Sequence, residues 1–429
     1  MATQFQWRKT NAPVASSRTD DIFFTDPQTG WAVNSNGQIL KTSDGGDNWV
    51  EQVRLPNAYL RCIGFANGKT GWVGTLTRDQ RLWSTQDGLH WSQVVNIPPN
   101  PTAICGISVV SESVVYASGT NYPNRPPAVI KTMDGGKTWS AIDMSQHASL
   151  LVDIHFEDEL RGWVVGGKGP GAKPAREEVT AVVLLTQDGG KTWVNAIANL
   201  AASLPKGEWG WKIFNLNDSI RFISLENFKE GAILKTQDGG RTWTRHIVND
   251  QQHNANLEGV GFVDEKQGWV GGWGTPDFSG GFSSETQDGG ENWTNSDDIG
   301  RLLNRFRFFH SPKLVGYASG DTVYKYDDTP VSRLLASAPV RASAIPASPA
   351  PIEISYSVSV GDRNLQIDVW DRFGEHVSRL LEQQNPQPGN GIAKWDGKTA
   401  DGRDALAGFY IYRVSTDQSA RSGIFRVGK

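Results

Sequence analysis

The segment Thr236-Gln-Asp238-Gly239-Gly240-Arg-Thr-Trp243 decides the fold, because close copies of it recur through the first three-quarters of the chain. One copy, Thr85-Gln-Asp87-Gly88-Leu-His-Trp91, is shortened. The aspartates of the six copies are Asp44, Asp87, Asp134, Asp188, Asp238 and Asp288. They lie 43 to 54 residues apart, and such a period is typical of β-propeller blades with four strands each.

The segment has the composition of a tight turn that is closed by an aromatic side chain. Its aspartate can accept hydrogen bonds from backbone N–H groups, and its glycines adopt backbone angles that other residues avoid. Its tryptophan folds back over the turn and buries a large apolar area. The segment resembles the Asp-box, or BNR, repeat, and this resemblance implies that the six aspartates are structural.

A second landmark, an aromatic residue at the start of a strand, precedes each turn and occurs seven times, most clearly at Gly30-Trp31 and Gly162-Trp163. The seventh copy is followed by Thr322 to Tyr326 but by no further Asp-box turn. The missing strand is present at the other end, where Phe5-Gln-Trp7-Arg-Lys resembles the residues that follow each turn. We therefore expect an all-β chain in which residues 1–328 form a seven-bladed propeller, closed by an N-terminal strand at residues 4–10.

The composition changes after the last repeat. Residues 329–351 are rich in Ala, Ser and Pro and are expected to form a linker. Alternating apolar residues and turn signals return over residues 352–429, which predicts a small β-sandwich. Its motifs are Val369-Trp-Asp371-Arg-Phe-Gly374, Trp395-Asp396-Gly397 and Gly408-Phe-Tyr410-Ile-Tyr412-Arg. They resemble the Ig-like domain of the flagellar hook-capping family and related modules at the C-termini of secreted bacterial proteins.

Composition excludes several function classes. The net charge of -4 does not favour nucleic-acid binding. Two cysteines, Cys62 and Cys105, cannot form a disulfide framework or a four-ligand zinc site, and no metal or cofactor is expected. No apolar segment is long enough to span a membrane, and the N-terminus lacks a signal-peptide pattern, which favours the cytoplasm. The resemblance of the tail instead implies a cell-surface or extracellular location.

Strand alternation places a mixed-charge group at the centre of the expected propeller. Its members are Asp21, Asp153, His155, Arg305 and Arg307. Two interpretations stay open: a network of ion pairs that fills a narrow channel, or an anchor for an anion or a peptide, since arginine is well suited to bind carboxylates. Asp21 and Asp153 are the only acidic residues of this set, and they lie three blades apart.

One face of the propeller carries long insertions at residues 119–128, 166–180, 194–210 and 271–283. Long loops on one face of a repeat fold are often functional, and aromatic residues and arginine are enriched in binding sites. The candidates for partner binding are Arg61, Tyr122, Arg125, Lys168, Arg176, Trp209, Trp211 and Trp273. The alternative, that these loops only pack on one another, stays open.

Residues 18–326 resemble the photosystem II assembly and stability factor family in layout. This resemblance implies a propeller without catalysis that binds a protein partner, although the tail is an addition and no lipid-attachment cysteine stands near the start. We expect an assembly scaffold that presents its loop-rich face to a protein or peptide. Its tail would dock it to a cell-surface, secretion or phage-tail-like assembly. The alternative is a carbohydrate-binding protein or a glycoside hydrolase, but no Arg-Ile-Pro segment of sialidases occurs, and xyloglucan-cleaving hydrolases use two propellers.

Overall fold

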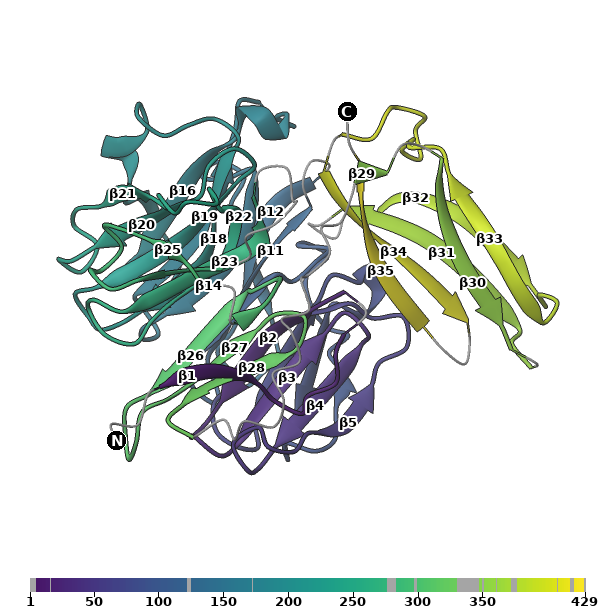
Figure 1. Cartoon of the computed structure of the whole chain (residues 1–429), viewed down its shortest axis with the longest axis horizontal. Helices are drawn as coiled ribbons and strands as arrows, with labels where there is room; N and C mark the ends of the chain where they lie inside the picture. The colour runs from purple at the N-terminus through teal and green to yellow at the C-terminus, as the bar shows by residue number, and fades with distance from the viewer. Residues whose placement is uncertain are drawn as a thin grey trace.

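The computed structural model of the chain describes residues 5–15, 17–121, 125–171, 173–275, 283–296, 299–329, 347–348, 351–359, 361–371, 376–406, 408–416 and 420–427. Regular structure in these residues is almost entirely β, and seven of the sheets have four antiparallel strands each (Figure 1). We call residues 5–329, which contain these seven sheets, the sheet ring. Residues 351–427, which form two further sheets, are the tail. The described helices are three single 3-10 turns, none of which could span a membrane.

Within the sheet ring, the strands recur in a fixed order. The first strands are β2 (Thr19–Phe24), β6 (Leu60–Phe65), β10 (Gly106–Val109), β14 (Leu150–Phe156), β18 (Glu208–Asn215), β22 (Ala255–Phe262) and β26 (Arg305–Phe309). The second strands are β3 (Gly30–Asn34), β7 (Gly71–Thr75), β11 (Val115–Asn121), β15 (Gly162–Lys168), β19 (Arg221–Asn227), β23 (Gly268–Gly274) and β27 (Val315–Ser319).

The third strands are mostly buried where their side chains are described, whereas the fourth strands are short and more exposed. The third strands are β4 (Gln38–Thr42), β8 (Leu82–Thr85), β12 (Arg125–Thr132), β16 (Thr180–Thr186), β20 (Ala232–Thr236), β24 (Ser283–Thr286) and β28 (Val323–Asp327). The fourth strands are β5 (Val50–Arg54), β9 (Ser92–Gln93), β13 (Ser140–Asp143), β17 (Val194–Asn195), β21 (Thr244–Ile247), β25 (Thr294–Asn295) and, from the other end of the chain, β1 (Gln6–Lys9). The 3-10 turns η1 (Arg78–Gln80), η2 (Arg176–Glu178) and η3 (Ala198–Leu200) lie in the connections.

Aromatic stacking joins neighbouring sheets. Tyr116 of β11 stacks on Phe156 of β14 with ring centroids 3.5 Å apart. The last sheet meets the first in the same way, because Tyr317 of β27 stacks on Phe24 of β2 at 3.7 Å. The glycine that begins several second strands makes room for this phenylalanine: a Cβ at Gly162 would lie 2.5 Å from the Phe156 ring. The second landmark of the sequence is therefore an intersheet packing element.

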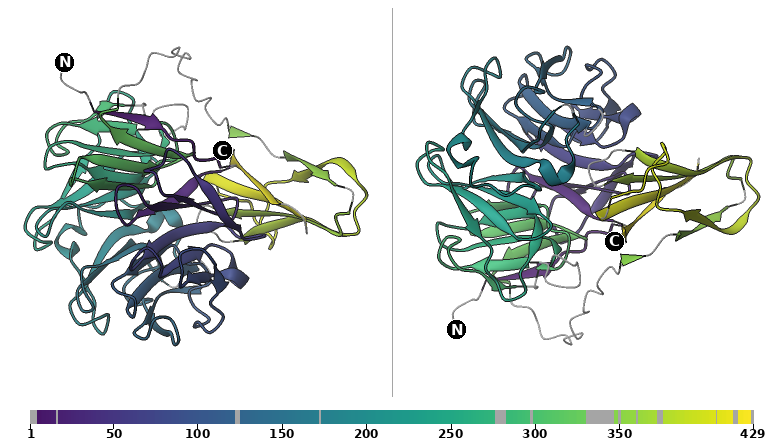
Figure 2. Two further views of the ribbon diagram at one scale, coloured as in Figure 1. Left: turned by 90° about the horizontal axis from the view of Figure 1, so that it is seen from below. Right: turned by 90° about the horizontal axis from the view of Figure 1, so that it is seen from above.

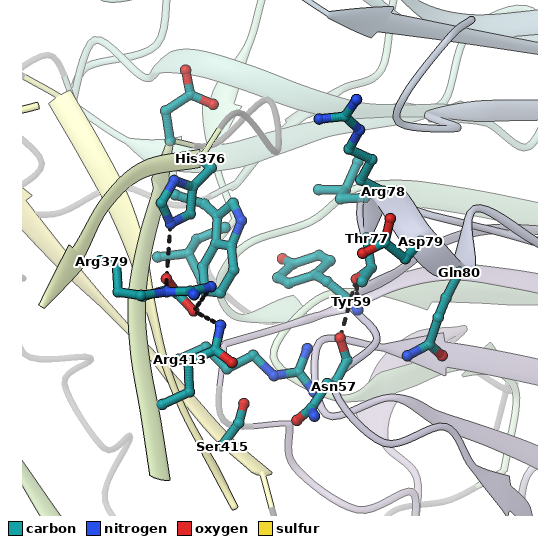
Figure 3. A pocket seen from close by; sticks show the side chains of 16 residues that line it. Asn57, Tyr59, Thr77, Arg78, Asp79, Gln80, His376, Arg379, Arg413 and Ser415 are labelled. Atoms are coloured by element: carbon teal, nitrogen blue, oxygen red, sulfur yellow. Dashed lines mark hydrogen bonds and ion pairs between the residues drawn. The ribbon is translucent and has the colours of Figure 1, made fainter. Parts of the chain in front are cut away.

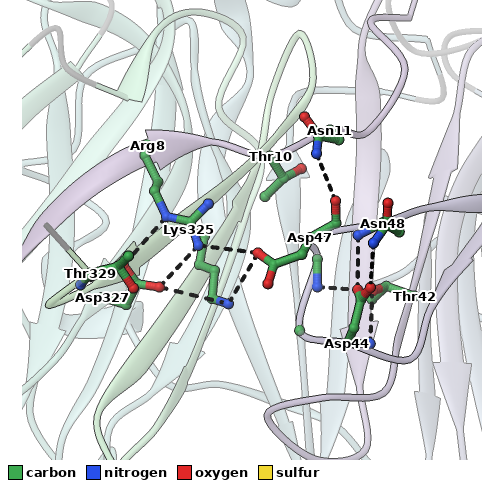
Figure 4. A network of polar contacts seen from close by, with 12 residues as sticks. Arg8, Thr10, Asn11, Thr42, Asp44, Asp47, Asn48, Lys325, Asp327 and Thr329 are labelled. Atoms are coloured by element: carbon green, nitrogen blue, oxygen red, sulfur yellow. Dashed lines mark hydrogen bonds and ion pairs between the residues drawn. The ribbon is translucent and has the colours of Figure 1, made fainter. Parts of the chain in front are cut away.

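The N-terminal strand pairs where the sequence predicts. β1 runs antiparallel to β28, with Trp7 opposite Tyr326. Arg8 forms ion pairs with Asp327 at 3.1 Å and with Asp47 of the first sheet at 3.3 Å (Figure 4). The strand therefore completes one sheet and also contacts the next one.

The Asp-box turns share one hydrogen-bond pattern, seen clearly at Asp238. Its Oδ1 accepts hydrogen bonds from the Thr236 hydroxyl and from the Thr242 N–H, each at 2.9 Å, and its Oδ2 accepts from the Thr242 hydroxyl at 2.6 Å. The Trp243 indole N–H donates to the Gly240 carbonyl at 3.2 Å. Hydrogen bonds from the Thr242 side chain and backbone lower the pKa of Asp238 to about 2. The pKa values of Asp44, Asp134, Asp188 and Asp288 are lowered to about 2 in the same way, and that of Asp87 is also lowered.

Acidification is expected to destabilise the protein through these turns. The folded-state pKa of Asp238 lies below the unfolded value near 3.8, so its hydrogen bonds contribute stability that is complete above about pH 4 and is lost as the pH falls through about 2. Asp238→Asn should therefore show a shallower loss of unfolding temperature between about pH 4 and pH 2 than the parent. Trp243→Phe in the same turn is the control, because it weakens the turn without removing a carboxylate. Equal slopes for Asp238→Asn and the parent would contradict this account.

The tail consists of a five-stranded and a two-stranded sheet. The first has the order β29-β35-β34-β31-β32 and the second pairs β30 with β33. Their strands are β29 (Ala347–Ser348), β30 (Ile352–Val358), β31 (Asn364–Asp371), β32 (His376–Gln384), β33 (Gly389–Trp395), β34 (Gly408–Thr416) and β35 (Ala420–Val427). Apolar residues such as Ile367, Trp395, Tyr410 and Phe425 form the core between the two sheets. Of the expected linker, most residues lie outside the described part of the chain, as do residues 372–375 of the expected turn after Asp371.

Candidate functional site

The expected central charges come together at the middle of the sheet ring. The Arg305 side chain, from β26, donates from Nε to Asp21 Oδ1 at 3.0 Å and from both terminal nitrogens to Asp153 at 2.8 and 2.9 Å. Each carboxylate also binds the adjoining sheet: Asp21 accepts the Ile63 N–H and Asp153 accepts the Ile213 N–H. These contacts fix the first strands to one another, and they correspond to the ion-pair interpretation of the group.

His155 and Arg307 complete this group without joining the ion pairs. Burial, opposed only in part by the nearby carboxylates, lowers the pKa of Arg307 to about 10, with Arg305 as a second cause. Burial also lowers the pKa of His155 to about 4, and the positive charge of Arg307 adds to this shift. His155 is therefore neutral near pH 7.

A second buried layer of charge lies beside the first, and the sequence did not predict it. Arg18 donates to Asp20 at 2.8 Å and also pairs with Glu258, and Arg61 donates to the same Asp20 carboxylate at 2.5 Å. Arg61 also lies over the ring of Trp211, 5.0 Å from its centroid. All of these charged side chains are buried.

β-Bulges explain why strand alternation missed this layer. The pairing register of β2, β6 and β22 shifts around residues 20, 61 and 258, which are Asp20, Arg61 and Glu258. A bulge inserts one residue and so interrupts the period of two on which the sequence prediction relied. The signal in the sequence is a charged residue directly before an expected first strand, since Asp20, Arg61 and Glu258 precede Asp21, Cys62 and Gly259.

The loop-rich face is not open, which corrects the expectation for the partner-binding candidates. Arg61, Arg176, Trp209, Trp211 and Trp273 are all buried. Arg176 pairs with Asp371 of the tail, and Trp273 stacks on Phe409 of the tail with ring centroids 4.2 Å apart. Lys168 donates to the Ser145 carbonyl at 2.6 Å. Tyr122 lies outside the described residues; Arg125 begins β12, and its side chain is not described.

The tail covers this face with the outer side of its five-stranded sheet (Figures 1 and 2). Along β34, Tyr410 and Val414 point into the tail core, whereas Phe409 and Ile411 face the sheet ring. Ile411 packs with Tyr59, Leu76, Ala103 and Cys105 of the ring. The sequence signal for this contact is the unbroken apolar run from Gly408 to Tyr412, since a strand with one exposed face alternates instead.

Phe409→Asp is expected to release the tail from the sheet ring. The change places a charge without a partner against Trp273 and Leu302, and such burial costs several kcal/mol. Small-angle X-ray scattering should show a larger radius of gyration, and hydrogen exchange at Leu76 and Ala103 should accelerate. Ile392→Asp is the control, because that tail side chain is already exposed. Unchanged scattering for Phe409→Asp would show that the contact does not hold the tail.

A cleft of about 540 Å³ remains open at one edge of this contact (Figure 3). Its ring side comprises Asn57, Tyr59 and the segment Leu76 to Gln80, and its tail side comprises residues of β31, β32 and β34. The tail residues are Gln366, Asp368, Trp370, Asp371, His376, Arg379, Ile411, Arg413 and Ser415. The volume lies within the range of about 300–1,000 Å³ that is usual for small-molecule sites. Trp370, Asp371, Ile411 and Arg413 belong to motifs of the tail that the sequence analysis quotes, but no motif indicated a cleft, because it is formed only where the two parts meet.

Asp368 is the central hydrogen-bond acceptor on the tail side of the cleft. Its carboxylate accepts hydrogen bonds from His376 at 2.8 Å, from Arg379 at 2.9 Å and from Gln366 at 2.5 Å. Despite burial, which acts the other way, these donors hold the pKa of Asp368 below its usual range. Arg413 stands opposite Asp368 in the strand register, but it is not among these donors.

Within the described residues, no group of three or more His, Cys, Asp or Glu is arranged to hold a metal ion. Both cysteines are buried. The repeated four-stranded sheets, the intersheet stacking and the central ion pairs define an all-β protein of the β-propeller class.

Comparisons with known proteins agree with this class. Residues 1–144 match the family model described as photosynthesis system II assembly factor YCF48. The photosystem II assembly lipoprotein Ycf48 of Synechococcus sp. (strain CC9902) is 33% identical over 132 residues, which make up 28% of this chain and 35% of that relative. The chain therefore matches only about a third of the length of this curated relative.

Two solved structures share the fold over three-quarters of the chain. One is YCF48 bound to D1 peptide, which has a TM-score of 0.53 at 17% identity and is aligned over 75% of this chain and 96% of its own. The other is YCF48 from Cyanidioschyzon merolae, with a TM-score of 0.53 at 18% identity over 75% of this chain and 98% of its own. At these identities the likeness concerns the fold.

Proposed function

We propose that this chain is a non-enzymatic protein-interaction or assembly protein. In this proposal, residues 1–328 are a seven-bladed Asp-box propeller, residues 329–351 are a linker and residues 352–429 are an Ig-like domain. The match of residues 1–144 to an assembly-factor family supports the interaction role. The structure of a relative with a bound peptide supports a peptide or protein as the partner.

The single observation that carries the proposal is that the central carboxylates Asp21 and Asp153 are held in ion pairs. Asp21 and Asp153, the acidic pair that strand alternation places at the centre, are both buried and bound to Arg305. Glycoside hydrolysis needs one carboxylic acid that can donate a proton to the substrate and a second carboxylate nearby. Arg305, with Lys212, lowers the pKa of Asp153 well below its usual range although burial acts the other way, so this carboxyl cannot serve as the acid.

The tail takes a different role in this proposal from the one expected of it. We infer that it shields the loop-rich face and, together with Tyr59 and Arg78 of the propeller, forms the surface that meets the partner. The edge strand β32 and the two-stranded sheet of β30 and β33 then remain available to dock the protein to a larger assembly. Whether this assembly is a cell-surface, secretion or phage-tail-like structure depends on the partner.

The test is capture of partners by the full-length protein, followed by reconstitution of a binary complex from purified components. We expect saturable binding to one protein or peptide, and we expect that Tyr59→Asp, which changes the cleft, weakens it. Ile392→Asp, on the exposed side of the tail, is the matched control. Polysaccharide hydrolysis that is lost in Asp153→Asn would overturn the non-enzymatic role.

Carbohydrate binding is the second candidate, and one observation favours it. Trp370 is partly exposed and lines the open cleft, where an indole ring can stack on a sugar. A glycan array with the full chain distinguishes the two, because a carbohydrate-binding protein should lose its glycan signal in Trp370→Ala.

A further inference from the structure

The cleft between the propeller and the tail contains a buried arginine, Arg413, whose hydrogen-bonding capacity is not filled by the described residues. Arg413 is only 4% exposed. Among the described residues, no acceptor lies within hydrogen-bonding distance of its Nε or its Nη2. A buried guanidinium is almost always paired, because a charged group without hydrogen bonds in a protein interior is costly.

Asp368 attracts the charge of Arg413, but among the described residues no group accepts a hydrogen bond from its Nε or Nη2. Its cross-strand neighbour Asp368 is the nearest carboxylate in register, but both oxygens of Asp368 already accept hydrogen bonds from other side chains. The other tail carboxylate of the cleft, Asp371, is bound to Arg176, and the third, Asp79, lies on the ring side. Arg379 is engaged with Asp368 and with Glu382. Arg413 is then left without a carboxylate that accepts a hydrogen bond from its Nε or Nη2 among the described residues.

The Arg413 side chain points into the cleft. Arg413 lies on β34 between Ile411, which packs on the propeller, and Ser415, which lines the cleft. Figure 3 shows its side chain reaching from the tail strand towards the loop of Asn57. The hydroxyl of Ser415 and the amide of Asn57 add neutral polar groups beside it.

We propose that this cleft binds a carboxylate group carried by a peptide, with Arg413 as the anchor that receives it. A carboxylate matches the planar, forked donors of a guanidinium, and two charge-assisted hydrogen bonds would satisfy the free Nε and Nη2. The carboxylate is either the C-terminus of the peptide or an Asp or Glu side chain. This inference rests on the proposed interaction function and names the chemistry that the partner must present.

The same arrangement predicts that the charge of Arg413 favours ligand binding but lowers the stability of the unliganded protein. Burying a cation without a partner destabilises the protein in the absence of ligand, and functional sites commonly carry such a cost. Arg413→Met keeps much of the packing volume and removes the charge. It should therefore keep or raise the unfolding temperature of the unliganded protein while it removes binding.

The experiment measures fluorescence anisotropy of labelled peptides with the full-length protein. The probes are the hexapeptide Ser-Gly-Ser-Asp-Glu-Ala with a free C-terminus, the same peptide with a C-terminal amide, and Ser-Gly-Ser-Asn-Gln-Ala in both forms. We expect saturable binding of at least one carboxylate-bearing probe and none of the fully amidated Asn-Gln form. Comparison of the Asp-Glu peptide with a C-terminal amide and the Asn-Gln peptide with a free C-terminus identifies whether the side-chain or the terminal carboxylate is bound.

Arg413→Met should weaken this binding about tenfold or more, since a charge-assisted pair is lost. Arg54→Met is the matched control, because Arg54 is an exposed arginine of β5, paired with Glu51 and outside the cleft. Absence of saturable binding by every probe would overturn the proposal, and so would equal binding by the parent and Arg413→Met. A partner complex that persists in Arg413→Met would overturn this site but leave the proposed function intact.

Discussion

Arg305→Ala should lower the free energy of unfolding by about 3–5 kcal/mol, because breaking a buried ion pair leaves the remaining charges without compensation. Arg305 donates to both Asp21 and Asp153, which come from β2 and β14 and are buried. Lys212 is the other cation near Asp153, but its Nζ lies 3.9 Å from the carboxylate. The measurement is urea unfolding monitored by tryptophan fluorescence.

Arg307→Ala is the matched control for this change. Arg307 lies two residues further along the same strand, and within the described residues its Nε has no hydrogen-bond acceptor. Its removal should cost less than that of Arg305 or even stabilise the protein. Arg305→Met combined with Asp21→Asn and Asp153→Asn should recover part of the loss, because the two carboxylates that Arg305 compensates are then neutral. Equal destabilisation by Arg305→Ala and Arg307→Ala would show that the ion pairs of Arg305 do not stabilise the centre of the sheet ring.

Removal of residues 1–10 is expected to lower the unfolding temperature strongly. The deletion leaves the edge of β28 unpaired and takes away Trp7, which packs edge-on against Trp269 and Phe306 at centroid distances of 5.4 and 5.7 Å. Trp7→Ala alone should cost about 3–5 kcal/mol, as for other large-to-small changes in a core. An unpaired edge strand also invites association with other chains, so the deletion variant should aggregate more readily.

Differential scanning calorimetry and light scattering test this second prediction. Arg8→Ala on the same strand is the control: its ion pairs are partly exposed, and pairs of this kind contribute about 1 kcal/mol or less. A melting curve of the deletion variant that matches that of the parent would mean that the N-terminal strand does not close the ring.

Much of the sheet ring could be predicted because its signals are local. Each Asp-box turn is formed by residues at most seven positions apart, such as Thr236 to Trp243, and its hydrogen bonds do not depend on the rest of the chain. The aromatic that begins each second strand predicts an intersheet contact because it repeats at the blade period. The N-terminal strand could be assigned because it resembles the fourth strand of every other repeat.

The candidate site could not be predicted to the same degree. Asp20, Arg61 and Glu258 enter the centre through bulges, and a bulge changes which way a side chain points without leaving a clear trace in the alternation. Trp209, Trp211 and Trp273 are aromatic residues in or beside long loops, as binding residues often are, but the structure buries them. Exposure depends on what else covers a surface, and composition does not contain that information.

The sequence by itself therefore determined the repeat, the turn that closes each outer hairpin, the all-β class and the closure by β1, since these follow from neighbouring residues and a regular period. The tertiary structure alone decided that the tail covers the loop-rich face and that, within the described residues, Arg413 Nε and Nη2 have no hydrogen-bond partner. The reason is the distance along the chain: Arg176 and Asp371 are 195 residues apart in sequence, yet they pair. No local pattern specifies which two surfaces of a chain will bury each other.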